Sequence, residues 1–181
     1  MSKNRTSQSI NTGNPTALTD AQIQRYARHI ILPEVGGNGQ IKLMKSKVLV
    51  VGAGGLGSPT VMYLAAAGVG KIGVVDDDIV EISNLQRQIL HTTSRLGMNK
   101  VDSADQAVRQ LNPEVELVPH SGRLKAENVQ HLLSDYDLII DGTDNFSTRF
   151  LLNDACYLSS RTLVSGAILG FEDQVATYKP Y

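Results

Sequence analysis

A glycine-rich segment stands directly between a short apolar run and a run of small residues. The segment is Gly52-Ala53-Gly54-Gly55-Leu56-Gly57, and it separates the β-branched residues 48–51 from residues 58–68. This order is typical of a buried strand, a tight turn and a helix. In that setting G-x-G-x-x-G indicates a nucleotide-binding loop. Gly52 permits the turn, Gly54 admits a phosphate and Gly57 lets the helix approach the sheet.

Apolar runs and helical periodicity alternate along the rest of the chain. We expect strands at 48–51, 71–75, 115–118, 138–140 and 163–166, and helices at 58–68, 100–111, 126–133 and 146–158. Residues 174–178 alternate and predict an antiparallel edge strand. Strands that alternate with helices predict an α/β fold, a Rossmann-like, doubly wound and mainly parallel sheet with helices on both faces.

The N-terminal part, residues 1–46, does not show this alternation of strands and helices. Residues 1–18 are polar and small, which predicts a flexible tail. Thr19 is expected to cap a helix that ends at Pro33, followed by a turn at 36–39 and a short helix at 40–46. Residues 19–181 are expected to form a single domain with this helical extension at its start.

Composition limits the classes of function. The 181 residues are 41% hydrophobic and carry a net charge of −1, so they can form a core and do not favour nucleic-acid binding. No leader or membrane-spanning run is visible, and we expect a cytoplasmic protein without membrane contact. The one cysteine, Cys156, cannot form an internal disulfide, and on its helix we interpret it as a small buried residue rather than a nucleophile.

Polar residues follow the second expected strand. Asp76 lies 24 residues after Gly52, where an acid can bind a ribose hydroxyl. Asn84 and Arg87 are one helical turn apart and Lys100 follows, so these side chains can neutralise a phosphate chain. The alternative for Arg87 or Lys100 taken alone is a solvated polar loop.

Asp144 follows the fourth expected strand, at the functional edge of a parallel sheet, and can bind Mg²⁺. Its alternative is to cap the helix that starts near Phe146. Arg28 and the histidines show no informative spacing. We interpret each as a surface or packed residue: His29, His91, His120 and His131.

Several motifs together resemble one family. They are Arg25-Tyr26-Ala27-Arg28-His29, the glycine segment 52–57, Asp76-Asp77-Asp78, Ser83-Asn84-Leu85-Gln86-Arg87-Gln88, Gly97-Met98-Asn99-Lys100 and Asp141-Gly142-Thr143-Asp144-Asn145. From about Thr19 to Tyr181 the chain resembles the ThiF/MoeB/HesA family, bacterial relatives of ubiquitin-activating enzymes. The branch of molybdopterin-synthase adenylyltransferases is the most similar.

The resemblance implies an adenylyltransferase that uses ATP and Mg²⁺. Its partner would be a ubiquitin-like sulfur carrier ending in Gly-Gly, activated as an acyl-adenylate for molybdenum cofactor biosynthesis. It also implies a role for each matching residue. Gly54 and Gly55 would lie against the phosphates, Asp76 would bind the ribose, Asn84, Arg87 and Lys100 would contact the phosphates, Asp144 would bind Mg²⁺, and Arg28 would come from the second subunit of a homodimer.

The family pattern continues beyond the motifs found here. Its members carry two Cys-x-x-Cys pairs for a structural zinc and a crossover loop for the carrier, and the sequence given has neither. We therefore expect the adenylation domain to be incomplete at its C-terminal end. The alternatives are a thiamine-pathway carrier as substrate, a Rossmann oxidoreductase, a tRNA-modifying dehydratase, or a nucleotide-binding, dimerising fragment without turnover.

Overall fold

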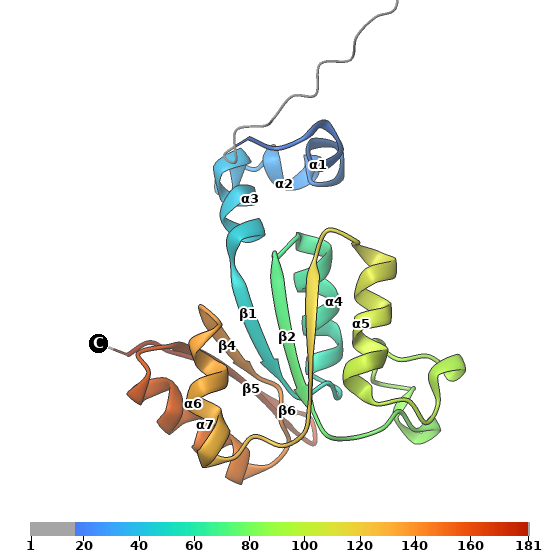
Figure 1. The fold of residues 1–181 in the computed structure, drawn as a ribbon, viewed down its shortest axis with the longest axis vertical. Coiled ribbons are helices and arrows are strands. Elements are labelled where there is room, and N and C mark those ends of the chain that lie inside the picture. Colours follow the sequence, from blue (N-terminus) through green and yellow to red (C-terminus); the bar gives the residue numbers. More distant parts are fainter. Residues whose placement is uncertain (1–16, 181) are drawn as a thin grey trace, which may run out of the picture. The chain divides into compact units, whose positions relative to one another are not determined.

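The computed structural model describes residues 17–180, and the strands in them form one six-stranded sheet (Figure 1). The strands are β1 (Lys47–Val51), β2 (Lys71–Asp76), β3 (Glu116–Ser121), β4 (Leu138–Asp141), β5 (Thr162–Leu169) and β6 (Glu172–Tyr178). The helices are α1 (Asp20–Arg25), α2 (Ala27–Ile30), α3 (Gly36–Lys45), α4 (Gly57–Ala67), α5 (Lys100–Leu111), α6 (Ala126–Ser134) and α7 (Phe146–Leu158). Two short 3₁₀ helices, η1 (Ile82–Asn84) and η2 (Thr93–Arg95), lie between β2 and α5.

The chain divides by its internal contacts into two compact units, and the boundary in the sequence falls between residues 41 and 42. In the first unit Thr19 caps α1 as predicted, because its side chain accepts from the Gln22 N–H while Gln22 accepts from the Thr19 N–H. The backbone leaves helical geometry at Tyr26, so the single helix expected up to Pro33 is in fact α1 and α2. The predicted flexible tail lies outside the described residues, apart from residues 17 and 18.

The predicted turn at residues 36–39 is wrong, because these residues form the first turn of α3. Gly36 has φ +60° at the start of the helix, a value that glycine adopts without strain. The Gly36 N–H donates to Leu32 O and the Gly39 N–H donates to Val35 O, so helical hydrogen bonds replace the turn. The weak helix propensity of these glycines is overridden by this local hydrogen bonding.

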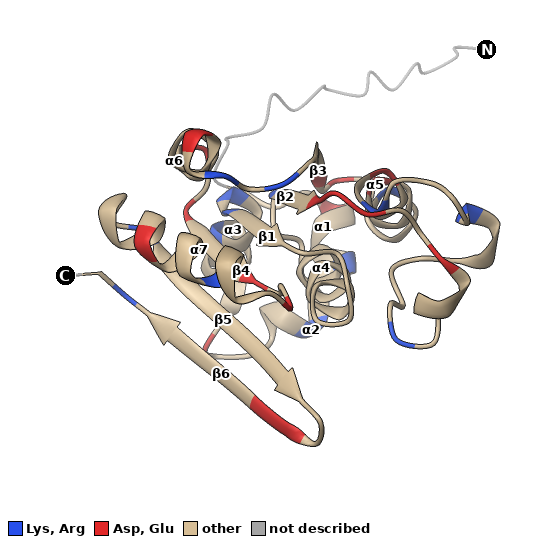
Figure 2. Cartoon of the chain, turned by 90° about the horizontal axis from the view of Figure 1, so that it is seen from below, with Lys and Arg blue, Asp and Glu red and all other residues tan. Residues whose placement is uncertain are grey.

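The sheet order is β3-β2-β1-β4-β5-β6, which confirms the doubly wound α/β fold. Neighbouring strands are parallel from β3 through β5, and β6 pairs antiparallel with β5, as the alternation at 174–178 predicted. Figure 2 shows β5 and β6 side by side as a long ribbon at one edge of the sheet.

Helices cover both faces of the sheet. The alternating side chains of β1 show this directly, since Val48 and Val50 belong to a core cluster with α4 and α5, whereas Leu49 and Val51 belong to a second cluster with α6 and α7. All four side chains are nearly inaccessible to solvent. A strand buried on both faces needs the continuous apolar run that the sequence shows.

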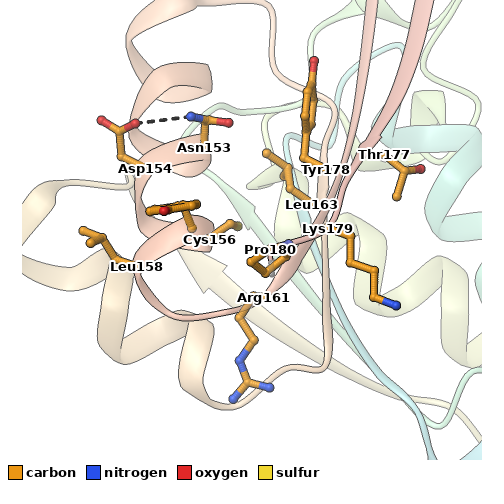
Figure 3. Close-up of a pocket in the computed structure, with 11 residues that line it drawn as sticks. Asn153, Asp154, Cys156, Leu158, Arg161, Leu163, Thr177, Tyr178, Lys179 and Pro180 are labelled. Carbon is orange, nitrogen blue, oxygen red and sulfur yellow. Dashed lines mark hydrogen bonds between the residues drawn. The ribbon is translucent and has the colours of Figure 1, made fainter.

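Cys156 is buried in α7, as interpreted from the sequence. Burial, together with the nearby charge of Asp141, raises the pKa of its thiol to about 11, so the sulfur stays protonated at neutral pH. The thiol borders a cavity of about 650 Å³ between α7 and the end of β6 (Figure 3). None of the site residues predicted from the sequence lines this cavity. No helix in residues 17–180 combines the length and apolar character needed to cross a bilayer.

Candidate functional site

The glycine segment lies where the sheet changes its direction of winding. β1 and β4 are adjacent, yet the chain leaves β1 for α4 on one face and leaves β4 for α7 on the other. The loops after these strands touch, since a Cβ on Gly52 would lie 2.9 Å from the Gly142 carbonyl oxygen. In open α/β sheets, the crevice at such a switch point is the usual ligand site.

The glycines of the segment meet different surroundings. Gly52 has φ +94°, and a Cβ on Gly57 would lie 1.8 Å from the Gly52 carbonyl oxygen, so both positions need glycine for the backbone to close. A Cβ on Gly54 or Gly55 would instead make ordinary van der Waals contact without a clash. The nearest atoms to a Cβ at these two positions are side-chain atoms 3.7 Å away.

Three successive backbone N–H groups, those of Gly54, Gly55 and Leu56, have no hydrogen-bond partner among residues 17–180. They lead into the N-terminus of α4, which no side chain caps. A helix N-terminus carries partial positive charge, and successive free N–H groups bind anions. This geometry suits a phosphate chain.

Asp76 ties β2 to the glycine segment. One carboxylate oxygen accepts from the Ala53 N–H at 2.7 Å, and the other accepts from the Asp78 N–H at 2.9 Å. A carboxylate oxygen has two lone pairs, so each oxygen can still accept from a ligand hydroxyl. The structure therefore places Asp76 beside the predicted phosphate loop, and its role with a ribose stays a prediction.

The Asn84–Gln88 turn lies against the same segment. Gln88 N donates to Asn84 O, which sets Asn84 and Arg87 on one turn, as the spacing predicted. The stem of the exposed Arg87 lies 3.7 Å from a Cβ placed on Gly55. Among the described residues its guanidinium donates one hydrogen bond, 3.3 Å long, to Ser83 O. Most of the Arg87 donors therefore remain available to a ligand.

Lys100 is buried, so the alternative interpretation of this residue as part of a solvated polar loop is wrong. The residue is 4% exposed, and its ammonium lies 2.8 Å from an Asp78 carboxylate oxygen. Asp78 itself is mostly exposed, so the pair sits at the protein surface with the lysine stem buried. Asp78 N bonds Asp76, and through this contact Lys100 is joined to the glycine segment.

Asp144 is exposed and has no hydrogen bond or ion pair among the described residues. The predicted capping role for Asp144 is wrong, because Asn145 caps α7 by accepting from the Thr148 N–H. Asp144 lies two residues after Gly142, which contacts the glycine segment. Its free carboxylate therefore lies on a loop that reaches the candidate site.

Asp76, Asp77 and Asp78 also lie close together, with ligand atoms within 4.8 Å of one another. Two of these carboxylates already have cationic partners, since Arg123 pairs with Asp77 at 2.6 Å and Lys100 pairs with Asp78. Asp144 has no cationic partner among the described residues, so its carboxylate is more available to a metal cation than those of Asp77 and Asp78.

Sequence reasoning missed the contacts of three polar residues near these loops, of which His91 and Gln88 are buried and Arg149 is half-buried. His91 is 5% exposed and bonds the Ala53 carbonyl at 3.0 Å, and Gln88 is 4% exposed and lies 3.7 Å from a Cβ on Gly54. Arg149 bonds the carbonyls of Thr143 and Gly166 behind the β4 loop and pairs with the buried Asp141. The position of Gln88 within the Asn84–Gln88 motif was the only signal in the sequence that pointed to any of them.

Arg28 lies on α2 and belongs to the first unit, whereas the residues described above belong to the second. The role that the resemblance gives it, across a dimer interface, stays a prediction.

Comparison with known proteins agrees with this geometry. Residues 26–181 match the ThiF family. The chain is 52% identical to adenylyltransferase and sulfurtransferase MOCS3 of Anopheles gambiae, over 90% of this chain and 37% of that protein. It is 50% identical to the SAMP-activating enzyme E1 of Haloferax volcanii, over 91% of this chain and 61% of that enzyme.

A solved structure gives the same fold. The E. coli tRNA N6-threonylcarbamoyladenosine dehydratase TcdA, in complex with AMP, superposes with a TM-score of 0.76 at 28% identity. The match covers 85% of this chain and 65% of that one. This chain thus spans less than two thirds of each of these three proteins.

Proposed function

The chain belongs to the ThiF family, and from this we propose that it uses ATP to adenylate the C-terminal carboxylate of a ubiquitin-like sulfur carrier ending in Gly-Gly. The observation that carries the proposal is the row of unpaired N–H groups at Gly54, Gly55 and Leu56, flanked by Arg87 at the switch point. The names of the MOCS3 and SAMP-activating relatives and the AMP bound to TcdA support it.

The chemistry needs charge stabilisation more than proton transfer. The carrier carboxylate attacks the α-phosphorus of ATP, a P–O bond forms, and the bond to the leaving pyrophosphate breaks. A carboxylate is ionised at neutral pH, so no general base is required. The Gly54 and Gly55 N–H groups, Arg87 and Lys100 stabilise the charge that develops on the phosphates, and Asp76 orients the ribose.

Asp144 is the residue that would hold Mg²⁺. Its exposed carboxylate has no partner among the described residues, which fits a hard cation that also takes phosphate oxygens. When bound, Mg²⁺ neutralises part of the phosphate charge. A structural zinc does not fit the residues present, since the sequence offers one cysteine and that cysteine is buried in α7.

The substrate that we favour is the small subunit of molybdopterin synthase, in the cytoplasm, with the thiamine-pathway carrier as the alternative. The enzyme would act as a homodimer in which Arg28 of each chain reaches the site of the other. This arrangement is supported by the motif around Arg28, Arg25-Tyr26-Ala27-Arg28-His29.

ATP–pyrophosphate exchange tests the proposal. The chain would be assayed with Mg²⁺ and a purified sulfur carrier, beside the same carrier without its last glycine. We expect exchange only with the complete carrier, because the attacking carboxylate must reach the α-phosphorus. Exchange that is absent while ATP still binds would leave a nucleotide-binding fragment, and activation by tRNA without a carrier would favour the dehydratase alternative.

A further inference from the structure

Ala53 is held on both sides by side chains from other parts of the chain. Its N–H donates to Asp76 Oδ2 at 2.7 Å, and its carbonyl accepts from His91 Nε2 at 3.0 Å and, over a longer distance, from Ser58 Oγ at 3.3 Å. Ala53 is fully buried and His91 nearly so. Both polar groups of this one residue are therefore fixed, which sets the orientation of the peptide bond that leads to Gly54.

That orientation determines where the next N–H points. The 53–54 peptide is trans, since no cis bond occurs among residues 17–180, and in a trans peptide the C=O and N–H point in opposite directions. The Ala53 carbonyl points inward to the buried His91. The Gly54 N–H consequently points outward, and it has no partner among the described residues.

The hydrogen-bond partners assign the tautomer of His91. A carbonyl can only accept, so Nε2 carries the proton toward Ala53. Nδ1 then accepts from Ser103 Oγ at 2.9 Å, and Ser103 Oγ accepts in turn from Arg95 Nη1 at 3.1 Å. Donors and acceptors match at every step from Arg95 through Ser103 and His91 to Ala53, and the imidazole is neutral.

We propose that His91 is a positioning residue that aims the Gly54 N–H at the phosphate chain of a nucleotide. The proposal rests on the proposed function, because it assumes that phosphates occupy the glycine segment. It extends that function to a buried residue which does not itself reach the ligand. The polar chain behind it, from Ser103 on α5 to Arg95 on η2, makes α5 part of the support of the phosphate site.

Nucleotide binding by His91 variants tests this inference. His91→Leu removes the shorter of the two hydrogen bonds to the Ala53 carbonyl and leaves that of Ser58, whereas His91→Gln retains an N–H that can reach the same carbonyl. Binding of ATP, ADP and adenosine would be measured by calorimetry. We expect His91→Leu to weaken ATP and ADP binding by about tenfold to a hundredfold, the usual worth of a hydrogen bond to a charged group, while adenosine binding stays within about twofold.

His91→Gln should recover most of the lost affinity for ATP. The matched control is His120→Leu, since His120 is partly buried and bonds Tyr136 OH at 2.8 Å but, among residues 17–180, has no hydrogen bond to the glycine segment. This control should leave the affinity for ATP unchanged. Ser103→Ala keeps the size of the site and removes only the hydroxyl that orients His91, so it should weaken ATP binding several-fold, with adenosine unaffected.

Each outcome has one meaning. If the wild-type chain does not bind ATP, the proposed function itself fails. If the wild type binds ATP and a folded His91→Leu binds it equally well, the positioning role is overturned. An equal loss for ATP and adenosine would also overturn it, because that pattern indicates general structural damage. Should His91→Leu not fold, Ser103→Ala decides in the same way.

Discussion

Arg87 and Lys100 carry the positive charges that the sequence assigned to the phosphates, and the two differ in their surroundings. Arg87 is exposed with most of its donors free, whereas Lys100 is buried along its stem and paired with Asp78. The sequence predicted the residue types and their neighbourhood. It could not predict which of the two is buried, because burial depends on contacts between segments distant in the sequence, such as that of Lys100 with Asp78.

Arg87→Ala should abolish measurable catalysis without affecting the fold. The side chain is exposed, so its loss should change the free energy of unfolding by less than about 0.5 kcal/mol. Exchange activity should fall by about a hundredfold or more, as expected when a preorganised cation is removed from a phosphate site. Arg109→Ala is the matched control, since Arg109 is exposed and, within residues 17–180, forms an ion pair with Asp105 alone. Equal losses of exchange activity in the two variants would refute the role of Arg87.

His91 should make stability depend on pH. Burial is the largest effect and lowers its pKa below the ordinary value of 6.5; Lys100 and Arg95 lower it further, while the Ala53 bond and Asp76 raise it. The unfolded chain therefore binds the proton more readily than the folded chain does. The His91 contribution to stability is complete above pH 6.5 and is lost as the pH falls toward the lower pKa of the folded state.

Urea unfolding at about pH 7.5 and about pH 5.5 measures this effect. The wild type should lose more stability between these values than His91→Gln does. His120 also has a pKa lowered by burial and remains in both proteins, so its contribution cancels in the comparison. Identical pH dependence in the two proteins would show that His91 does not titrate differently on folding.

At the scale of elements, most of the predicted helices and strands have their expected places. The strongly periodic segments at α5 and α7 agree with prediction in both bounds. The prediction for the glycine run at the start of α3 was wrong. The composition suggested a turn, but Leu32 and Val35 accept helical hydrogen bonds from these glycines. Partners of that kind cannot be derived from the propensity of single residues.

Alanine substitutions should separate the two kinds of glycine in the phosphate segment. Gly57→Ala would place a Cβ 1.8 Å from the Gly52 carbonyl oxygen, which the backbone can relieve only by moving, so we expect a loss of about 3 kcal/mol or more in the free energy of unfolding. Gly54→Ala has no such clash, with its nearest atom at 3.7 Å. It should fold normally and bind ATP more weakly. Thermal melting and calorimetry on both variants distinguish these outcomes.

The end of β4 should be sensitive to the loss of one buried charge. Asp141 is fully buried, accepts from Thr143 and Ser165, and lies 3.5 Å from Arg149. Asp141→Ala leaves the Arg149 charge without this partner, and we expect a loss of about 3 kcal/mol in stability. Asp154→Ala, on the exposed side of α7, serves as control and should cost little. A loss of less than about 1 kcal/mol for Asp141→Ala would show that Arg149 is solvated well enough to do without it.

At the scale of the whole molecule, the parallel order brings residues from distant parts of the sequence to one edge. The loops after β1, β2 and β4 meet there, and so Gly52, Asp76 and Gly142 come into contact or share partners. The alternation of strands and helices predicted this edge. The buried chain through His91 could not be predicted, because a histidine without a sequence motif gives no sign of its partners.

The proposed dimer makes a prediction that needs two variants. Arg28→Ala and Arg87→Ala should each be inactive in exchange. If Arg28 serves the site of the other subunit, a mixed dimer contains one intact site, and random mixing should restore about a quarter of wild-type activity. Mixtures that stay as inactive as either variant alone would place Arg28 outside the partner's site.

The most direct test of the phosphate site follows backbone amide signals by NMR during titration with ATP and Mg²⁺. The N–H groups of Gly54, Gly55 and Leu56 have no partner among residues 17–180, so they should take one from the ligand. We predict that these three signals shift strongly with ATP and much less with adenosine. Shifts confined to residues around the cavity between α7 and β6, with the three signals unmoved, would contradict the assignment of the nucleotide site.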